Sequence, residues 1–295
     1  MTVACPACGS FERGASRVVE DHEYRIPYTA LYVSCGACGS AHQVPMPSPE
    51  ILSSFYPENY HSQVGKGTLG RIRNALRLGR LKRWLQKGDV VLDYGCGDGT
   101  FLLQAADTMP GYRFFGYEIS SKTSIRKNKN GSVVIVEGGL EDLLKTLPPS
   151  RLVTMNHVIE HLPDPQLTLL RLYSKLVPGG ILEGQTPAAG CLEQKIFKSS
   201  WSGYHAPRHT VIFSPKGLRE LLKSCGFKKV KVTPAFNPAS WAVSLASAAE
   251  VPGGGSGIRR KGMIWLFWLG LATLLAPIDF FSGAPAIMNF SAVKE

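Results

Sequence analysis

One stretch of the chain places an acid directly before a run of closely spaced glycines. Residues 90–102 read Val-Val-Leu-Asp-Tyr-Gly-Cys-Gly-Asp-Gly-Thr-Phe-Leu. The order predicts a buried parallel strand, a tight turn and the start of a helix. Glycine lets the backbone approach a ligand that side chains would block. The spacing differs from the G-x-G-x-x-G of dinucleotide-binding turns, and the carboxylate of Asp93 would repel a pyrophosphate. The turn therefore favours a cationic or amino-bearing ligand.

A second group of chemically capable residues lies at 151–165, Arg-Leu-Val-Thr-Met-Asn-His-Val-Ile-Glu-His-Leu-Pro-Asp-Pro. Asn156 falls at the C-terminal edge of a predicted strand, where open α/β sheets bind ligands. His157, Glu160 and His161 have i, i+3, i+4 spacing and could share one face of a helical turn. A histidine with a pKa near neutrality suits removal of a proton from a hydroxyl or a carbon acid. The alternatives are a divalent-metal site and a purely structural turn.

A third group is the segment 201–210, which is rich in aromatic and basic side chains. His205 and His209 join His157 and His161 as candidate bases. Arg208 could bind a phosphate or carboxylate through two parallel hydrogen bonds. The alternative is that Arg208 and His209 hold this loop against the sheet.

Four of the seven cysteines form two C-x-x-C pairs, Cys5 with Cys8 and Cys35 with Cys38. Two such pairs supply the four thiolates that tetrahedral zinc prefers. We therefore expect a zinc ribbon over residues 1–44, with a structural zinc ion. The remaining cysteines are scattered and make no disulfide framework, and no signal peptide is apparent at the N-terminus, which favours a reducing cytoplasm.

The glycine turn and the 151–165 segment resemble class I S-adenosylmethionine-dependent methyltransferases of the UbiE/UbiG-like type (methyltransferase types 11 and 23). The resemblance implies a Rossmann-like α/β domain with a seven-stranded sheet and S-adenosylmethionine as cofactor. It implies that Glu118, at the end of the next strand, binds the ribose and that Glu141 or Asp142 contacts adenine. The cofactor-binding residues implied are Asp93, Gly95, Cys96, Gly97, Gly99, Glu118, Glu141 and Asn156.

The same resemblance predicts the domain organisation. Residues 45–64 form a Pro-rich linker whose aromatic end, with Tyr56, Tyr60 and His61, could fold over the cofactor as a lid. Residues 65–295 form the methyltransferase domain. A hydrophobic helical insertion at 238–285 precedes the last strand, which we expect at 287–293.

Charge and hydropathy point to a partner. The net charge is +11, and residues 66–87 carry eight basic side chains and no acid. Residues 263–281 are nearly all apolar and close to the length of a membrane span. A single crossing would place the two flanking strands on opposite sides of the bilayer. We therefore expect residues 259–281 to make a peripheral contact at the inner face of the membrane. A buried helix or a dimer contact is the alternative.

These features predict methyl transfer to a hydroxyl or carbon of a small acceptor such as a sugar, a lipid-linked glycan or a quinone-like molecule. Methylation of rRNA or tRNA is an alternative, disfavoured because the ribbon has few basic residues. A non-catalytic membrane-associated scaffold is a third reading. The sequence does not indicate an oligomeric state.

Overall fold

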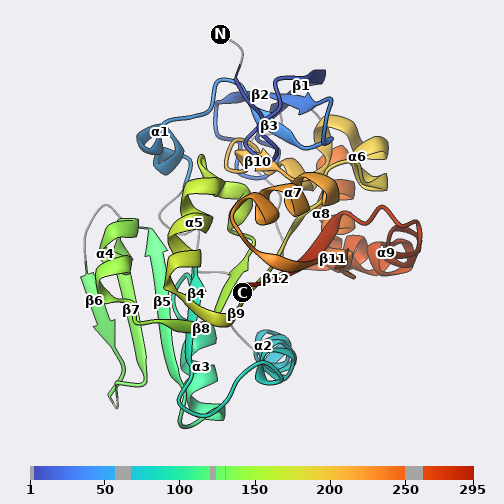
Figure 1. Cartoon of the computed structure of the whole chain (residues 1–295). Coiled ribbons are helices and arrows are strands. Elements are labelled where there is room, and N and C mark those ends of the chain that lie inside the picture. Colours follow the sequence, from blue (N-terminus) through green and yellow to red (C-terminus); the bar gives the residue numbers. More distant parts are fainter. Residues whose placement is uncertain (1–2, 57–67, 120–123, 130, 250–261) are drawn as a thin grey trace.

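An eight-stranded sheet forms the centre of the computed structural model, which describes residues 3–56, 68–119, 124–129, 131–249 and 262–295 (Figure 1). Its strands, in spatial order, are β11 (Lys228–Pro234), β12 (Ile287–Val293), β9 (Leu176–Pro187), β8 (Ser150–Asn156), β4 (Val90–Tyr94), β5 (Arg113–Ile119), β7 (Val133–Gly138) and β6 (Ser124–Lys127). The five central strands are parallel, whereas β6, β11 and β12 pair antiparallel. The expected α/β class is confirmed, with β6 as an added eighth strand.

Helices cover both faces of this sheet because neighbouring strand residues point to opposite faces. On β4, Val91 packs with α2 (Thr68–Lys82) and α3 (Thr100–Thr108), whereas Leu92 packs with the helices of the other face. Those helices are α4 (Leu140–Thr146), α5 (Pro165–Lys175) and α7 (Pro215–Ser224). The result is a three-layer core (Figure 1).

A second, four-stranded sheet has the order β1 (Arg13–Glu20), β2 (Thr29–Cys35), β3 (Ala41–Gln43) and β10 (Val211–Ile212). The first three strands belong to the cysteine-rich N-terminal segment. The fourth comes from far along the chain and pairs antiparallel with β3. The ribbon is thus joined to the main domain through backbone hydrogen bonds. A short helix, α1 (Pro49–Ser54), follows β3.

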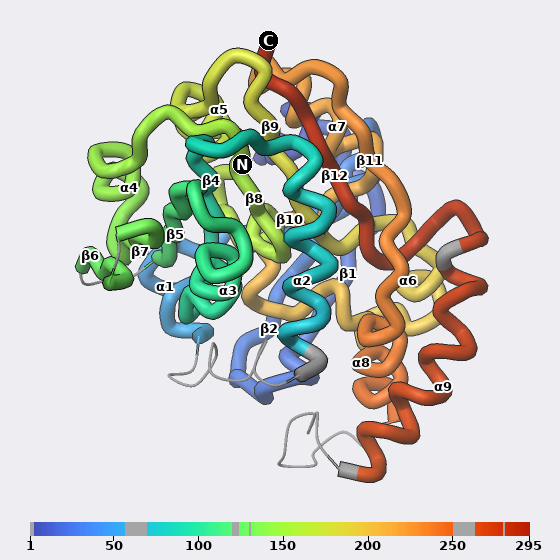
Figure 2. Tube along the Cα trace, turned by 90° about the horizontal axis from the view of Figure 1, so that it is seen from below, coloured from blue at the N-terminus to red at the C-terminus, as the bar shows by residue number. Residues whose placement is uncertain are grey.

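The hydrophobic insertion forms a helical unit at the edge of the molecule (Figure 2). Helix α8 (Pro238–Ala249) packs against α9 (Gly262–Phe281), and α6 (Leu192–Phe197) completes the unit. Its small core contains Trp241, Ala242, Ala272 and Ala276. Among the described residues, no helix has both the length and the hydrophobicity needed to span a bilayer.

Helix α2 divides its apolar residues between two faces. Leu78 and Leu81 pack inward against the sheet. Ile72 and Leu76 are exposed.

Candidate functional site

The glycine turn joins β4 to α3 in the conformation that its sequence predicts. Gly95 and Gly99 both have positive φ, 78° and 80°, a region that other residues rarely adopt. A Cβ on Gly95 would lie 2.5 Å from a methyl carbon of Val158, and one on Gly99 would lie 2.3 Å from Ile135. The turn therefore packs directly against the segment that follows β8. The two sequence signatures come together at the C-terminal edge of the sheet.

Asp93 is the last residue but one of β4, close to this turn, and is buried. Its carboxylate accepts hydrogen bonds from the Thr154 hydroxyl and from Arg77 of α2, the latter at 2.7 Å. Arg77 also lies over the ring of Phe101, with its guanidinium carbon 3.8 Å from the ring centroid. Asn156 belongs to the same group. With its side-chain amide turned so that the oxygen faces Arg77, that oxygen accepts a hydrogen bond from the guanidinium at 2.6 Å.

Arg77 was not singled out from the sequence, where it is one of eight basic residues spread over 66–87. No sequence signal distinguishes it, because only the structure shows that its neighbours Asn74 and Leu78 are buried. A half-buried guanidinium beside Asp93 places a cation where the resemblance puts the methionine part of the cofactor. Such a cation suits the carboxylate of an amino acid.

Glu118 lies near the end of β5, where it was expected, and accepts a hydrogen bond from the backbone N–H of Gly97 at 2.7 Å. This contact couples the carboxylate to the turn. Cys96, between the glycines, is buried, and burial raises the pKa of its thiol. Glu141 opens α4 on the surface, where it is 3.7 Å from Arg171. The glycine cradle and the acid after β5 fit an adenosyl ligand.

His157 follows β8 with a φ of 55°, an uncommon backbone conformation for a residue with a side chain. Its Nδ1 lies 3.3 Å from the fully buried carboxylate of Glu160, and its Nε2 lies 3.2 Å from Gln185 Oε1. The side chain is 43% exposed, so the ring remains accessible. Surrounding protein lowers the pKa of His157, but the hydrogen bond and negative charge of Glu160 outweigh this, so that the pKa is raised above its ordinary value.

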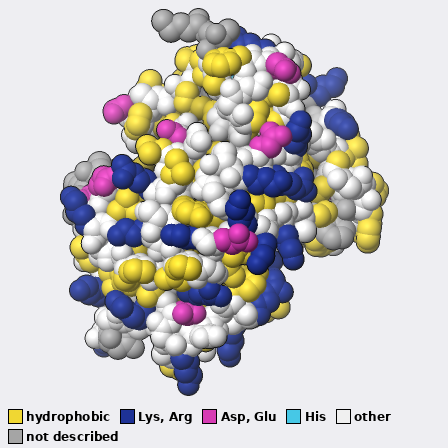
Figure 3. Space-filling view, viewed as in Figure 1, with side chains coloured by type: hydrophobic (Ala, Val, Ile, Leu, Met, Phe, Trp, Pro, Cys, Tyr) yellow, Lys and Arg dark blue, Asp and Glu magenta, His cyan; other side chains and the backbone are white. Residues whose placement is uncertain are grey.

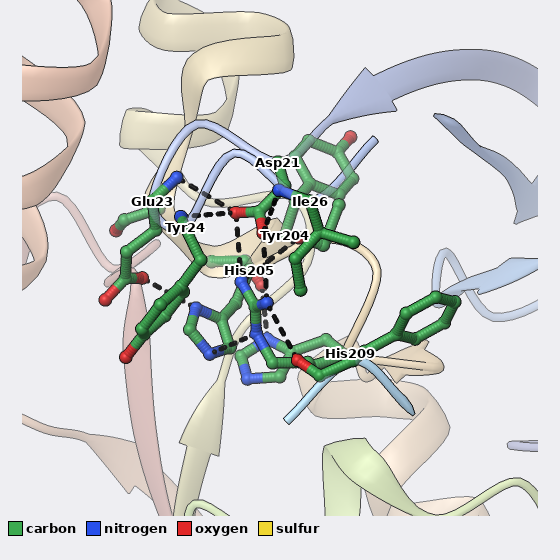
Figure 4. Close-up of polar contacts among 12 residues, drawn as sticks. Asp21, Glu23, Tyr24, Ile26, Tyr204, His205 and His209 are labelled. Atoms are coloured by element: carbon green, nitrogen blue, oxygen red, sulfur yellow. Dashed lines mark hydrogen bonds and ion pairs between the residues drawn. The ribbon is translucent and has the colours of Figure 1, made fainter. Parts of the chain in front are cut away.

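The other three candidate bases, His161, His205 and His209, have their rings in contact with one another. Figure 4 shows His205 and His209 beside Asp21 and Glu23 of the ribbon. His205 is engaged at both ring nitrogens: Nδ1 is 2.7 Å from Glu23, and Nε2 accepts from Arg208. His209 donates through Nδ1 to the Gly203 carbonyl, since a carbonyl can only accept. His161 donates likewise to the carbonyl of Arg208.

Arg208 is completely buried and binds Asp21 of the ribbon through two hydrogen bonds of 3.0 Å. Asp21 also accepts from the backbone N–H groups of Glu23, Tyr24 and Ile26 (Figure 4). Both ends of the ion pair are thus satisfied, as a buried pair requires. Of the two roles considered for Arg208, the structure supports the structural one, with the ribbon as the partner.

Burial also sets the charge of two of these histidines. It lowers the pKa of His161 to about 4 and the pKa of His209 well below its ordinary value. Both rings are therefore neutral near pH 7, with Nε2 carrying a lone pair. Together with Glu160 they could hold a divalent cation, because the three ligand atoms lie within 4.8 Å of one another.

The four N-terminal cysteines converge as expected. The Sγ atoms of Cys5 and Cys38 are 3.8 Å apart, those of Cys8 and Cys35 are 3.6 Å apart, and all four lie within 4.8 Å of one another. A hydrogen bond with Cys5 lowers the pKa of Cys38 to about 4. The donor set and its spacing fit a tetrahedral zinc ion.

Of the three lid candidates, Tyr60 and His61 lie outside the described residues. The Tyr56 hydroxyl is 2.8 Å from Nδ1 of His161. This part of the linker therefore approaches the histidine segment.

Comparisons with known proteins agree with this geometry. A family model described as "Methyltransferase domain" matches residues 69–232, more than half of the chain. A curated protein of Aspergillus luteorubrus named "Probable methyltransferase ltbC" is 30% identical over 142 residues, which cover 43% of this chain. The match covers about half of that relative's length (50%).

Two solved structures are similar in part. A SAM-dependent methyltransferase from Archaeoglobus fulgidus is 22% identical, with a TM-score of 0.47, over 76% of this chain and 94% of that one. Phosphoethanolamine N-methyltransferase 2 of Haemonchus contortus in complex with S-adenosyl-L-methionine is 18% identical, with a TM-score of 0.49, over 75% of this chain and 52% of that one.

Proposed function

Because this chain belongs to the class I S-adenosylmethionine-dependent methyltransferases, we propose that it methylates a hydroxyl or acidic carbon of a small acceptor and that His157 is the base. The acceptor classes that we favour are sugars, lipid-linked glycans and quinone-like molecules. RNA is a less favoured acceptor, because residues 1–44 carry three basic side chains against four acidic ones.

One observation carries the assignment of the base. His157 is accessible, is fixed by a buried carboxylate, and belongs to the segment that packs against Gly95 of the glycine turn. In the base form of this ring Nδ1–H stays paired with Glu160, and an acceptor hydroxyl takes the place of the Gln185 amide oxygen at Nε2. The carboxylate would stabilise the imidazolium that forms when the ring takes the acceptor proton.

The other residues hold and orient the ligand. When bound, S-adenosylmethionine supplies an electrophilic methyl group on a sulfonium. We propose that Arg77 binds the carboxylate of its methionine part, that the glycine turn lies against that part, and that Glu118 accepts from the ribose hydroxyls. Such alignment of donor and acceptor is the main contribution available to an enzyme of this kind.

We also propose that the cysteine cluster binds a structural zinc ion. Three of the four cysteines are buried, and Cys38 packs against α7, where the Ser214 hydroxyl donates to its carbonyl. A closed set of four thiolates leaves no open position for a substrate.

Calorimetric titration with S-adenosylmethionine tests the cofactor site. We expect Glu118→Ala and Asp93→Asn to weaken binding by about tenfold to a hundredfold, because each removes a charged acceptor. Asp107→Ala, which removes an exposed acid of α3, is the control and should bind like the wild type. Unchanged affinity in both site variants would refute the cofactor assignment.

Turnover tests the base. His157→Gln should bind S-adenosylmethionine with the affinity of the wild type. With any acceptor that the wild type uses, its rate of S-adenosylhomocysteine formation should fall to a small fraction of the wild-type rate. Sugar nucleotides, polyprenyl-linked glycans and quinols form the panel of acceptors. Full turnover by His157→Gln would exclude this histidine as the base.

A further inference from the structure

Helix α9 has an outward face without charge. Its inward face packs through Ala272 and Ala276 against α8. The outward apolar side chains, all more than half exposed, are Met263, Ile264, Leu266, Phe267, Leu274, Ile278 and Phe281. Asp279 is the one charged residue in the helix, and it is buried. Soluble monomeric proteins rarely leave an apolar surface of this extent exposed to water.

Helix α2 offers the complementary feature. Ile72 and Leu76 lie one turn apart and are 52% and 69% exposed. The exposed basic residues around them are Arg71, Arg73, Arg80, Lys82 and Arg83. No acid occurs between residues 65 and 88. A helix with exposed apolar residues set among cations has the composition of an interfacial helix.

Both helices are visible from one side of the molecule in Figure 2, with α2 near the middle of the view and α9 at its edge. In Figure 1 both lie below the ribbon, and apolar side chains appear at the right edge of Figure 3, where α9 lies. We propose that this side docks on the surface of an anionic phospholipid bilayer, with α9 entering the interface and α2 contacting the headgroups.

Charge distinguishes a bilayer from a second copy of the chain as the occupant. In a symmetric dimer the same patch meets itself, so the cations of one α2 would approach those of the other. No acid on this helix could neutralise them. Anionic headgroups neutralise them directly. The inference goes beyond the proposed reaction, since docking needs neither cofactor nor acceptor.

Flotation of the full-length protein with phosphatidylcholine vesicles, with and without phosphatidylglycerol, tests the proposal. We expect binding to vesicles that contain phosphatidylglycerol and weaker binding at high salt. The double variant Ile264→Ser/Leu274→Ser should bind about tenfold more weakly or worse, because it removes two exposed apolar anchors. The control is Leu167→Ser/Leu170→Ser on α5, where both residues are also exposed, at 49% and 44%.

A second variant tests the headgroup contact without touching α9. Arg73→Gln/Arg80→Gln should lower binding to anionic vesicles and reduce its dependence on salt. Equal flotation of the wild type and both variants would overturn the proposal. So would a wild type that does not float but forms a dimer that the α9 variant abolishes, because a second copy would then be the occupant. Titration with S-adenosylmethionine on the same samples keeps this result separate from the proposed reaction.

Discussion

At the scale of single residues, the four histidines differ in what their ring nitrogens contact. His205 uses both nitrogens within the protein, and His161 and His209 each donate to a backbone carbonyl. His157 is the most exposed of the four, with Nδ1 beside the Glu160 carboxylate and Nε2 beside the side-chain amide oxygen of Gln185. The sequence grouped all four as candidate bases because residue type and spacing do not reveal hydrogen-bond partners. The contacts favour His157.

The pH dependence of turnover follows from this pairing. The pKa of His157 is raised, so the base form appears only above the ordinary value of about 6.5. We expect kcat to rise with pH through an apparent pKa above that value. Glu160→Gln removes the negative charge that favours the imidazolium, so the rise should move to lower pH.

The control for this profile is Glu220→Gln, which removes an exposed carboxylate of α7 near Lys216. It should leave the profile in place. A profile that is the same in the wild type and in Glu160→Gln would show that Glu160 does not set the pKa of the base.

At the scale of elements, the strands with apolar runs were predictable from the sequence, and β4, β5, β7, β8, β9 and β12 lie where the runs are. The edge strand β6 was not, since only Ile125 of its four residues is apolar. Strand β10 has two residues and exists because β3 offers an unpaired edge. The inward face of α2 could not be read either, because its apolar residues surround the helix. Tertiary pairing decides such elements.

The helical unit of α6, α8 and α9 contains a buried acid with a consequence for stability. Burial, and then the nearby Asp279, raise the pKa of Glu193 to about 8, although the hydroxyls of Ser240 and Ser244 donate to it. The folded chain therefore keeps a proton that the unfolded chain releases near pH 4.5. Unfolding releases this proton, so stability falls as the pH rises from 4.5 towards 8.

Glu193→Gln resembles the protonated acid and should remove this loss. We expect the variant to be more stable than the wild type at pH 7, by up to about 3 kcal/mol, and to show little gain near pH 4.5. Urea unfolding followed by tryptophan fluorescence at both pH values measures the difference. Glu220→Gln again serves as the exposed control. An equal effect at both pH values would contradict the assignment.

At the scale of the whole molecule, the ribbon lies against the segment that contains His205 and His209. Tyr32 of β2 donates to the carbonyl of His209 at 2.6 Å, and Gln43 of β3 donates to the carbonyl of Pro207. Arg208, which is paired with Asp21, also donates to Nε2 of His205. The sequence predicted the ribbon from its cysteines but not its contacts, because partners more than 160 residues apart leave no local pattern. If the cysteine cluster binds zinc as proposed, loss of the ion should therefore disturb the contacts that the ribbon makes with His205, Arg208 and His209.

Removal of the metal tests whether the ribbon affects turnover without affecting the binding of S-adenosylmethionine. We expect Cys5→Ser/Cys35→Ser to lose about one zinc ion per chain by elemental analysis. Without that ion the ribbon should loosen and release Asp21 from Arg208, so kcat should fall at least about tenfold. Affinity for S-adenosylmethionine should change little, because its proposed contacts lie on α2, β4 and β5.

Cys225→Ser provides the control, since this buried cysteine of the main domain lies outside the cluster. It should keep both the metal and the turnover. If the paired variant lost zinc with no change in kcat, the ribbon would not shape the acceptor site. If it lost affinity for S-adenosylmethionine as well, the ribbon would support the whole sheet edge. The expected pattern, with binding kept and turnover lost, would place the acceptor between the ribbon and the glycine turn.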